Sequence, residues 1–344
     1  MRHVTALTAL AVALAVVGCG DGSSAMSGGA GEAGSTTQGG DTTSTTESAG
    51  ATRGAGAGSS SGDVASGSTA GGQGGSANLC GSCGTSTDAG IIANPEIAEL
   101  SGLAASRLHE GVLYAHNDSG DEPRFFAMTL AGVDRGTFSV TNATSEDWEE
   151  MSAGPCADGA LGCLYFADFG DNDEERDDLV LYRVREPASV GEGLEAEVEA
   201  EAFPFSYPDG PHNAEAFVVH PTTGVVTIFT KGVTSLVFEL APPFTAAMVA
   251  VARGEIALDS FVSLATGADI DPSGRVLAIR TYADVLLFPI AEGGSVADAL
   301  AQPSCPAPHG VESQGESVAF LLNGTSFVTA SEGQASELHL VDCP

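Results

Sequence analysis

Short apolar runs alternate with polar stretches from residue 99 to the end of the chain, and these runs recur as a unit. Each unit has a polar entry leading into an apolar strand, a turn, a second strand, a polar loop and a third strand. The entries lie at 99–103, 147–151, 213–217, 266–270 and 314–318. Short antiparallel strands in units of about 50 residues are typical of β-propeller blades.

The remaining strands of each unit follow from the same pattern. The second strands are predicted at 112–116, 163–167, 225–229, 275–279 and 326–330, and the third strands at 124–130, 179–184, 235–240, 285–290 and 337–341. Segments between units, such as 136–140 and 198–205, are suited to fourth strands. The last unit lacks one, and residues 90–98 are expected to fill that place and close the ring. The predicted fold is therefore all-β, a β-propeller with five blades, or six if an insertion hides another unit.

The start of the chain does not follow this repeat. Met1-Arg2-His3 precedes an apolar run over 4–17 and then Gly18-Cys19, which is the pattern of a secretory signal. This ending resembles the bacterial lipobox, and the resemblance implies that Cys19 carries a lipid anchor; an ordinary signal peptide with a chance cysteine is the alternative. We therefore expect an exported monomer, anchored by lipid at the outer membrane or cell surface.

The segment 20–79 consists almost entirely of Gly, Ser, Thr and Ala. It has too few large apolar side chains to offset the entropy of ordering, so we expect a disordered tether. The predicted organisation is a signal peptide over 1–19, the tether over 20–79 and the propeller over 80–344.

Charge restricts the partners of the predicted propeller. The chain has a net charge of −34, and removing the residues before Cys80 leaves 10 basic and 41 acidic residues, a net charge near −31. Such a field repels nucleic acid and attracts cations. Lys231 is the only lysine in the chain.

Six cysteines remain besides Cys19, an even number that suits disulfides in an exported protein. Cys156 and Cys163 are close enough in sequence to join within one hairpin. The pairing of the other four is open, and a bond from Cys343 to either of the first two would lock the ring. A zinc site that includes Cys80 and Cys83 is the alternative. These four cysteines are Cys80, Cys83, Cys305 and Cys343.

Several short strings carry a family resemblance. They are Glu-Leu-Ser-Gly-Leu-Ala at 99–104, His-Asn-Asp-Ser-Gly-Asp at 116–121, Asp-Trp-Glu-Glu at 147–150, Phe-Gly-Asp-Asn at 169–172, Tyr-Pro-Asp-Gly-Pro-His-Asn-Ala-Glu-Ala at 207–216, Ile-Arg-Thr-Tyr-Ala-Asp at 279–284 and Gln-Gly-Glu-Ser at 314–317. Together they resemble a family of secreted bacterial β-propeller proteins, often labelled WD40-like or TolB-like. This resemblance implies the fold but no settled activity. A looser architectural likeness links the chain to calcium-dependent propeller hydrolases such as β-propeller phytases and gluconolactonases.

Carboxylates take equivalent positions in the repeat. Glu149, Glu215 and Glu316 are the third residues of their entries, where the other two units have Ser101 and Ala268. In a propeller, these entries share a face with the loops between the second and third strands. Converging oxygen atoms suit a hard cation, and calcium is the expected ion. The predicted metal ligands are Glu149, Glu215, Glu316, Asn117, Asp118 and Asp168. Side chains that merely face water in a wet channel are the alternative.

Cationic and aromatic side chains are expected at the same face. Lys231, Arg280, His212 and Tyr282 are the predicted ligand-binding residues, and Glu149, Glu215 and His116 are the predicted catalytic residues if the protein is an enzyme. The acidic run 168–178 is a second candidate for calcium, with a solvated turn as its alternative.

Three functions fit these features. The first is a surface-tethered protein that binds a divalent cation and a small ligand or a glycan. The second is a metal-dependent hydrolase acting on phosphoesters or lactones, in which the ion polarises an oxygen or activates water. The third is a scaffold that uses this face for protein contacts alone.

Overall fold

The computed structural model describes residues 81–343, so the predicted signal peptide, the lipidated Cys19 and the tether lie outside the described residues. Strands make up nearly all of the regular structure, and one short helix, α1 (Val296–Leu300), is described. Within residues 81–343, no helix has the length and apolar character needed to span a bilayer.

The strands form successive antiparallel sets. The first two sets are β2 (Leu100–Ala105), β3 (Val112–Asn117), β4 (Arg124–Thr129) and β5 (Asp134–Thr141), then β6 (Trp148–Pro155), β7 (Leu161–Asp168), β8 (Val180–Arg185) and β9 (Glu195–Ser206). The next two are β10 (Ala214–Val219), β11 (Val226–Thr230), β12 (Ser235–Leu240) and β14 (Val251–Ile256), then β15 (Ala265–Ile270), β16 (Val276–Thr281), β17 (Val285–Pro289) and β18 (Cys305–Ala307). The last set is β19 (Gly315–Phe320), β20 (Ser326–Ser331), β21 (Glu337–Asp342) and β1 (Thr87–Ile91). A parallel pairing of β5 with β9 joins the first two sets, and the short β13 (Met248–Val249) also pairs with β9.

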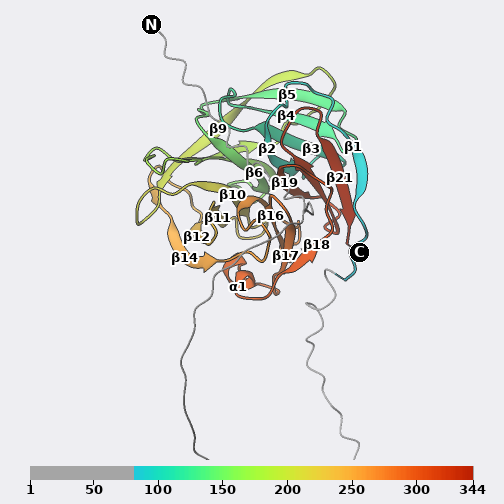
Figure 1. Ribbon diagram of the computed structural model, residues 1–344. Helices are drawn as coiled ribbons and strands as arrows, with labels where there is room; N and C mark the ends of the chain where they lie inside the picture. Colours follow the sequence, from blue (N-terminus) through green and yellow to red (C-terminus); the bar gives the residue numbers. More distant parts are fainter. Residues whose placement is uncertain (1–80, 344) are drawn as a thin grey trace, which may run out of the picture. The chain divides into compact units, whose positions relative to one another are not determined.

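The first strand of each set lies on the inside. Contacts run from β2 to β6, β10, β15 and β19 and back to β2, and almost every residue of these strands is buried. The last strands of the sets, such as β5, β14 and β18, lie at the periphery (Figure 1). Apolar side chains fill the space between neighbouring sets, as where the Phe125 ring of β4 and the Phe166 ring of β7 lie with their centroids 5.3 Å apart. The fold is therefore all-β and β-propeller-like.

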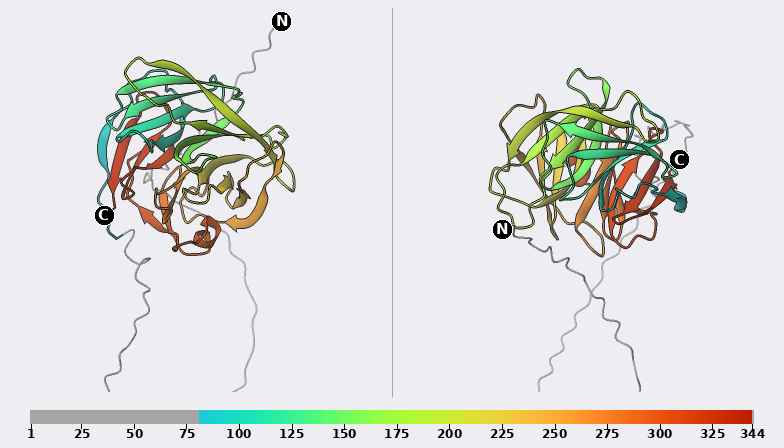
Figure 2. Two further views of the ribbon diagram at one scale, coloured as in Figure 1. Left: turned by 180° about the vertical axis from the view of Figure 1, so that it is seen from behind. Right: turned by 90° about the horizontal axis from the view of Figure 1, so that it is seen from above.

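The N-terminal strand adds to the C-terminal set. β1 pairs antiparallel with β21, and the two lie side by side in opposite views (Figures 1 and 2). The predicted strand at 90–98 was placed too late, because only 90 and 91 belong to β1. Residues 94–97 instead form a turn, in which the Ile97 amide donates to the Asn94 carbonyl at 3.2 Å. Pro95, which has no N–H to donate to a ladder, lies inside this turn.

Each inner strand has a register shift near its start. The shift falls at Glu149 in β6, at Glu215 in β10 and at Glu316 in β19. A shift of this kind bends the strand and re-aims the side chain of the extra residue. In β15 the shift falls at Thr266, so the sequence alignment that placed Ala268 at the equivalent position was wrong by two residues. The error arose because β15 begins one residue before its predicted entry, whereas β6, β10 and β19 each begin one residue after theirs.

Two disulfides join described cysteines. Cys156–Cys163 confirms the predicted hairpin bond. Cys83–Cys343 joins the segment before β1 to the segment after β21, so Cys83 has no free thiolate for the alternative zinc site. Cys305 is also disulfide-bonded.

Candidate functional site

A cavity of about 200 Å³ lies where the inner strands begin. We call it the acidic cavity, because its lining has five carboxyl groups and one ammonium group. The lining residues are Leu100, Ser101, Asp118, Glu149, Asn172, Glu215, Lys231, Tyr282, Gln314, Glu316 and Glu332. The structure therefore brings together six of the residues predicted from the sequence: Glu149, Glu215, Glu316, Asp118, Lys231 and Tyr282.

Two backbone features supply most of this lining. The register shifts place Glu149, Glu215 and Glu316 in the cavity, together with Ser101 near the start of β2. The second feature is the position directly after the second strand of a set, where the side chain lines the cavity. Asp118, Lys231, Tyr282 and Glu332 each follow such a strand directly.

Three carboxylates converge beside the cavity, two of them from its lining. One oxygen each of Asp118, Asp147 and Glu149 lie within 4.8 Å of one another, and we call these residues the carboxylate trio. Gly170 allows this approach, since a Cβ atom there would lie 2.3 Å from Glu149 Oε1 and 2.4 Å from Asp147 Oδ2. The trio thus depends on a residue without a side chain behind it.

An ion pair lies next to the trio. Lys231 Nζ donates to Glu215 Oε1 at 2.5 Å, and it lies 5.6 Å from the centre of the Tyr282 ring. Asn213 Nδ2 also donates to Glu215 Oε1, at 3.4 Å, and Asn213 Oδ1 accepts from the Asp171 amide. Glu215 is therefore neutralised by its own partner, whereas no other lining carboxylate has an ammonium partner in this cavity.

The pKa values report the excess of negative charge. Burial and the neighbouring Asp118 carboxylate raise the pKa of Asp147 to about 7. Burial, with Glu215 and Asp118, raises the pKa of Glu149 well above its usual range, and burial with Glu215 does the same for the pKa of Glu316. A proton or a metal ion relieves this repulsion, and both act on the same oxygen atoms.

Two predicted metal ligands use their oxygens elsewhere. Asn117 Oδ1 accepts from the amides of Ala98 and Glu99 at 3.0 and 3.2 Å, which anchors the segment before β2. Asp168 accepts from the amides of Glu146 and Asp147 and from Arg176 Nη2 at 2.9 Å. Neither side chain lines the acidic cavity.

Arg176 also organises the acidic run 168–178. Its guanidinium donates to the Gly170 carbonyl at 2.9 Å and to Asp178 at 3.1 Å. The carboxylate of Asp171 accepts from the amides of Glu175 and Arg176. These bonds describe a loop organised by arginine and by backbone amides.

Three further predicted residues lie away from the cavity lining. His116 is fully buried against Trp148, its Nδ1 donates to the Asn117 carbonyl at 2.7 Å, and burial lowers its pKa. Arg280 is fully buried and pairs with Glu312 at 2.7 Å. His212 pairs with Asp209 at 3.0 Å and packs against Tyr207 and Phe238.

Sequence reasoning missed several residues of this site. Asp147, Glu332, Gln314 and Asn172 were not among the predicted ligands, although Glu332 occupies the same repeat position as Asp118. That equivalence was a usable signal for Glu332. Asp147 gave a weaker one, because it precedes the strand and the space for its carboxylate depends on the absence of a side chain at Gly170.

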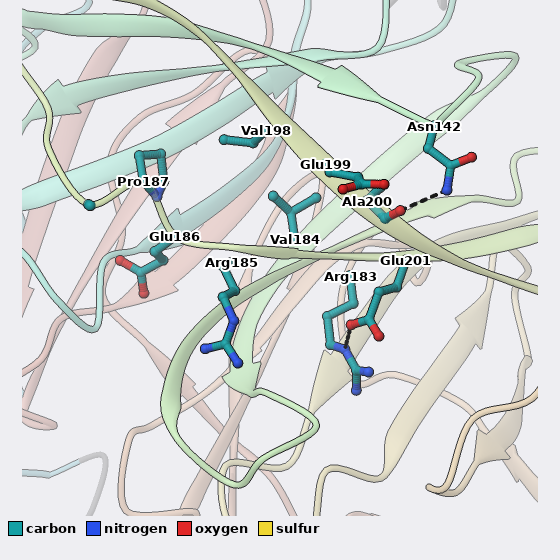
Figure 3. Close-up of a pocket in the computed structure, with 11 residues that line it drawn as sticks. Asn142, Arg183, Val184, Arg185, Glu186, Pro187, Val198, Glu199, Ala200 and Glu201 are labelled. Carbon is teal, nitrogen blue, oxygen red and sulfur yellow. Dashed lines mark hydrogen bonds and ion pairs between the residues drawn. The ribbon is translucent and has the colours of Figure 1, made fainter.

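A larger hollow of about 680 Å³ lies between β8 and β9 (Figure 3). Several of its charged side chains have partners: Arg183 binds Glu201 at 2.8 Å, and Glu186 accepts from Ser106 Oγ and from the Arg107 amide. None of its lining residues belongs to a group of converging metal-ligand atoms among residues 81–343, unlike those of the acidic cavity.

Comparisons with known proteins identify no family for this chain. No family model matches it, and no curated protein matches its sequence. Among solved structures, the chain is similar to U3-55K over 71% of its length and 67% of that chain, with 11% identity and a TM-score of 0.36. It is similar to a chain of a nidogen/laminin complex over 68% of its length and 73% of that chain, with 11% identity and a TM-score of 0.41. It is also similar to Raptor from Chaetomium thermophilum over 78% of its length and 30% of that chain, with 12% identity and a TM-score of 0.39. Scores this low assign no function.

Proposed function

We propose that the acidic cavity binds a divalent cation together with a small hydroxyl-rich ligand, and that calcium is the preferred ion. The observation that carries this proposal is the carboxylate trio, whose oxygens lie within 4.8 Å of one another beside a cavity. Calcium takes six to eight oxygen ligands at about 2.3–2.6 Å, so small side-chain rotations bring all three oxygens onto one ion. Water and ligand oxygens complete the shell.

Electrostatics favours the ion over an empty site. The cavity gathers five carboxyl groups against the single ammonium group of Lys231, and that group is already paired with Glu215. The raised pKa values of Asp147 and Glu149 mean that ionised carboxylates repel one another there. At neutral pH these raised pKa values favour protonated carboxyl groups, and a divalent cation relieves the same repulsion by taking the place of the protons.

The same charge count favours a neutral ligand. With one calcium bound, the carboxylates still outnumber the positive charges of the cavity, so an anionic ligand is repelled. Hydroxyl groups suit the site better, because they donate to Glu316 and Glu332 and offer their own oxygens to calcium. The volume of about 200 Å³ is below that of most drug-sized pockets, which fits a single sugar unit or a similar small group.

A metal-dependent hydrolase is the second candidate, on one observation. Without a metal on its oxygens, Asp147 has a pKa raised to about 7, which suits a general base near neutral pH if Asp118 and Glu149 hold the ion. The sequence-based choice of Arg280 as a ligand-binding residue has less support, since its guanidinium is fully buried against Glu312 and is not free to bind a phosphate. Phosphoesters are therefore weaker candidates than neutral lactones.

The fold supplies the setting for this proposal. We infer that the strand sets are five propeller blades and that β1 closes the ring, because the inner strands contact one another in a cycle and β1 completes the last set. The lipid anchor at Cys19 and the tether over 20–79 would hold this propeller near a membrane outside the cytoplasm.

Calcium titration by isothermal calorimetry tests the proposal. Wild type should bind one calcium ion per chain, and Asp118→Asn and Glu149→Gln should each weaken binding. Glu292→Gln is a matched control, because that side chain is 89% exposed and lies outside the cavity lining. Equal calcium affinity in all four proteins would contradict the proposal.

The calcium-loaded protein should then bind neutral sugars in preference to the matching uronic acids. Chelation should abolish this binding, because the ion holds part of the ligand. Preference for the acids would exclude a neutral hydroxyl-rich ligand while leaving the calcium site intact.

A further inference from the structure

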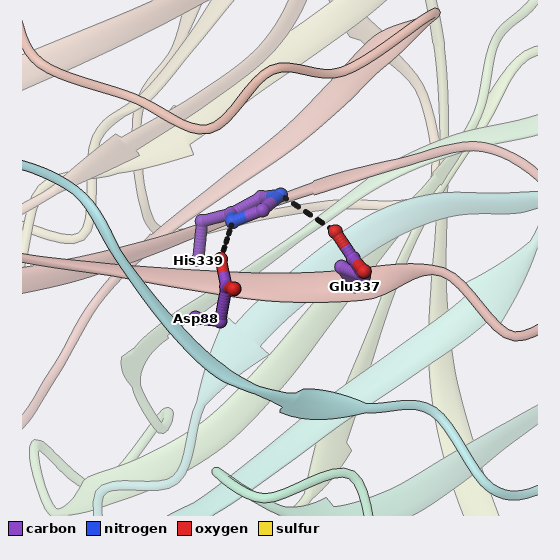
Figure 4. A group of neighbouring side chains, drawn as sticks. All are labelled: Asp88, Glu337 and His339. Atoms are coloured by element: carbon purple, nitrogen blue, oxygen red, sulfur yellow. Dashed lines mark ion pairs between the residues drawn. The ribbon is translucent and has the colours of Figure 1, made fainter.

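A second cluster lies on the strand pair β1–β21. These are the two outer strands of the last set, whereas the acidic cavity is lined from the inner strand, β19. Asp88 on β1 stands directly opposite His339 on β21 in the antiparallel register. Glu337 precedes His339 by two residues, so both side chains project from the same face of β21. Figure 4 shows the three side chains converging, with the imidazole between the two carboxylates.

The two carboxylates lie at opposite ring nitrogens of His339. His339 Nδ1 lies 3.2 Å from Asp88 Oδ1, and His339 Nε2 lies 3.9 Å from Glu337 Oε2. One ligand atom from each residue lies within 4.8 Å of the other two. The cluster therefore has the size of a three-ligand metal site with room for water.

The histidine is held in place, whereas the carboxylates are free to adjust. His339 is 5% exposed, and a Cβ atom on Gly310 would lie 1.9 Å from His339 Cδ2, so the ring packs directly on that glycine. The side chains of Asp88 and Glu337 are 82% and 58% exposed. A fixed imidazole with exposed carboxylates beside it allows a metal to be bound without rearranging the sheet.

The arrangement of the ring itself indicates a cation. A neutral imidazole has one N–H and one lone pair, so it satisfies only one of two flanking carboxylates. A proton or a metal ion on the second ring nitrogen supplies the positive charge that the other carboxylate then requires. A metal ion competes with the proton for that nitrogen, and it also binds the carboxylate oxygens directly.

We propose that Asp88, Glu337 and His339 bind Zn²⁺ or a similar transition metal and thereby fasten the N-terminal strand to the C-terminal strand. Imidazole and carboxylate ligands with open positions suit zinc, whereas calcium selects oxygen ligands alone. The site would act beside the Cys83–Cys343 disulfide, which joins the same two ends of the described chain. It does not depend on the function proposed for the acidic cavity.

Calorimetry of zinc binding tests this proposal. The protein used is the full chain with Glu149→Gln, because this change removes one ligand of the carboxylate trio and so reduces zinc binding there. This protein should bind one Zn²⁺ per chain. Adding His339→Ala, Asp88→Asn or Glu337→Gln should weaken that binding by roughly 10–100-fold or more, since even the loss of an outer partner of a metal ligand has an effect of that size. His212→Ala is the matched control, because it removes a His–Asp pair of 3.0 Å that belongs to no three-ligand cluster among residues 81–343.

Hydrogen exchange provides a second readout, in which each variant is compared with itself in the presence and absence of zinc so that stability differences between variants do not enter. Zinc should slow amide exchange in residues 87–91 of the Glu149→Gln protein and should leave exchange unchanged once His339 is replaced. Zinc affinity that is equal in the three ligand variants and the control would overturn the site. Zinc binding without slower exchange in β1 would overturn its role as a fastener.

Discussion

Lys231 Nζ lies 2.5 Å from Glu215 Oε1, so the only lysine in the chain neutralises one of the glutamates of the acidic cavity. Both groups are largely buried, with side-chain exposures of 23% and 6%. This pair limits the negative charge that the cavity holds and leaves the carboxylate trio as the part with unbalanced charge.

Replacing Lys231 with Met should destabilise the metal-free protein by about 2–4 kcal/mol near neutral pH, because Glu215 then lacks its partner among other carboxylates. The double variant Lys231→Met with Glu215→Gln should recover much of this loss, since it leaves no unpaired charge. Urea denaturation of the two single variants and the double variant measures the coupling. Strictly additive effects would show that the ion pair contributes nothing.

The pH dependence of stability should reveal Asp147. Its pKa rises from 3.8 to about 7 in the folded protein, so the protonated form is favoured by folding. Its stabilising contribution is therefore fully present below about pH 4 and is lost as the pH rises through 7. In the presence of chelator, Asp147→Asn should melt like wild type near pH 4 and several degrees higher than wild type at pH 8.

Saturating calcium should reverse that order at pH 8, because wild type then gains an ion ligand that Asp147→Asn lacks. Melting curves with chelator and with calcium, each at pH 4 and pH 8, give four differences in melting temperature between wild type and Asp147→Asn. A wild-type advantage in chelator at pH 8 would contradict the raised pKa of Asp147.

The disulfide between Cys83 and Cys343 should contribute more than the local one. It spans 260 residues, whereas Cys156–Cys163 spans 7, and a longer closed loop restricts the unfolded chain more. Replacing Cys83 and Cys343 together with Ser should cost roughly 2–5 kcal/mol, and replacing Cys156 and Cys163 together should cost less. Guanidinium denaturation compares the two. A larger loss from the local pair would contradict a fastening role for Cys83–Cys343.

Much of the fold could be predicted from the sequence because the repeat is regular. Apolar periodicity located the second and third strands, and the repeat frame aligned Glu149, Glu215 and Glu316 at equivalent positions. These three glutamates do meet in one cavity. Equivalent positions in repeated units point to the same place, so the prediction needed only the correct frame.

Side-chain direction was harder to predict than position. His116 and Arg280 lie inside β3 and β16, where side chains pack between sheets, whereas Asp118 and Tyr282 follow those strands and line the cavity. A difference of two residues therefore separates a core side chain from a cavity side chain. The sequence shows the strand but leaves its last residue uncertain by one or two positions.

Thermal melting of wild type in calcium and in sodium at equal ionic strength tests the central proposal most directly. If only the folded protein binds calcium, its free energy of unfolding rises by about 2.7 kcal/mol when calcium is at 100 times its dissociation constant. Calcium should therefore raise the melting temperature by several degrees above the value in sodium, and Glu149→Gln should remove most of that difference. Equal melting temperatures in the two salts would mean that the carboxylates only line a wet channel, and the cation-binding proposal would be wrong.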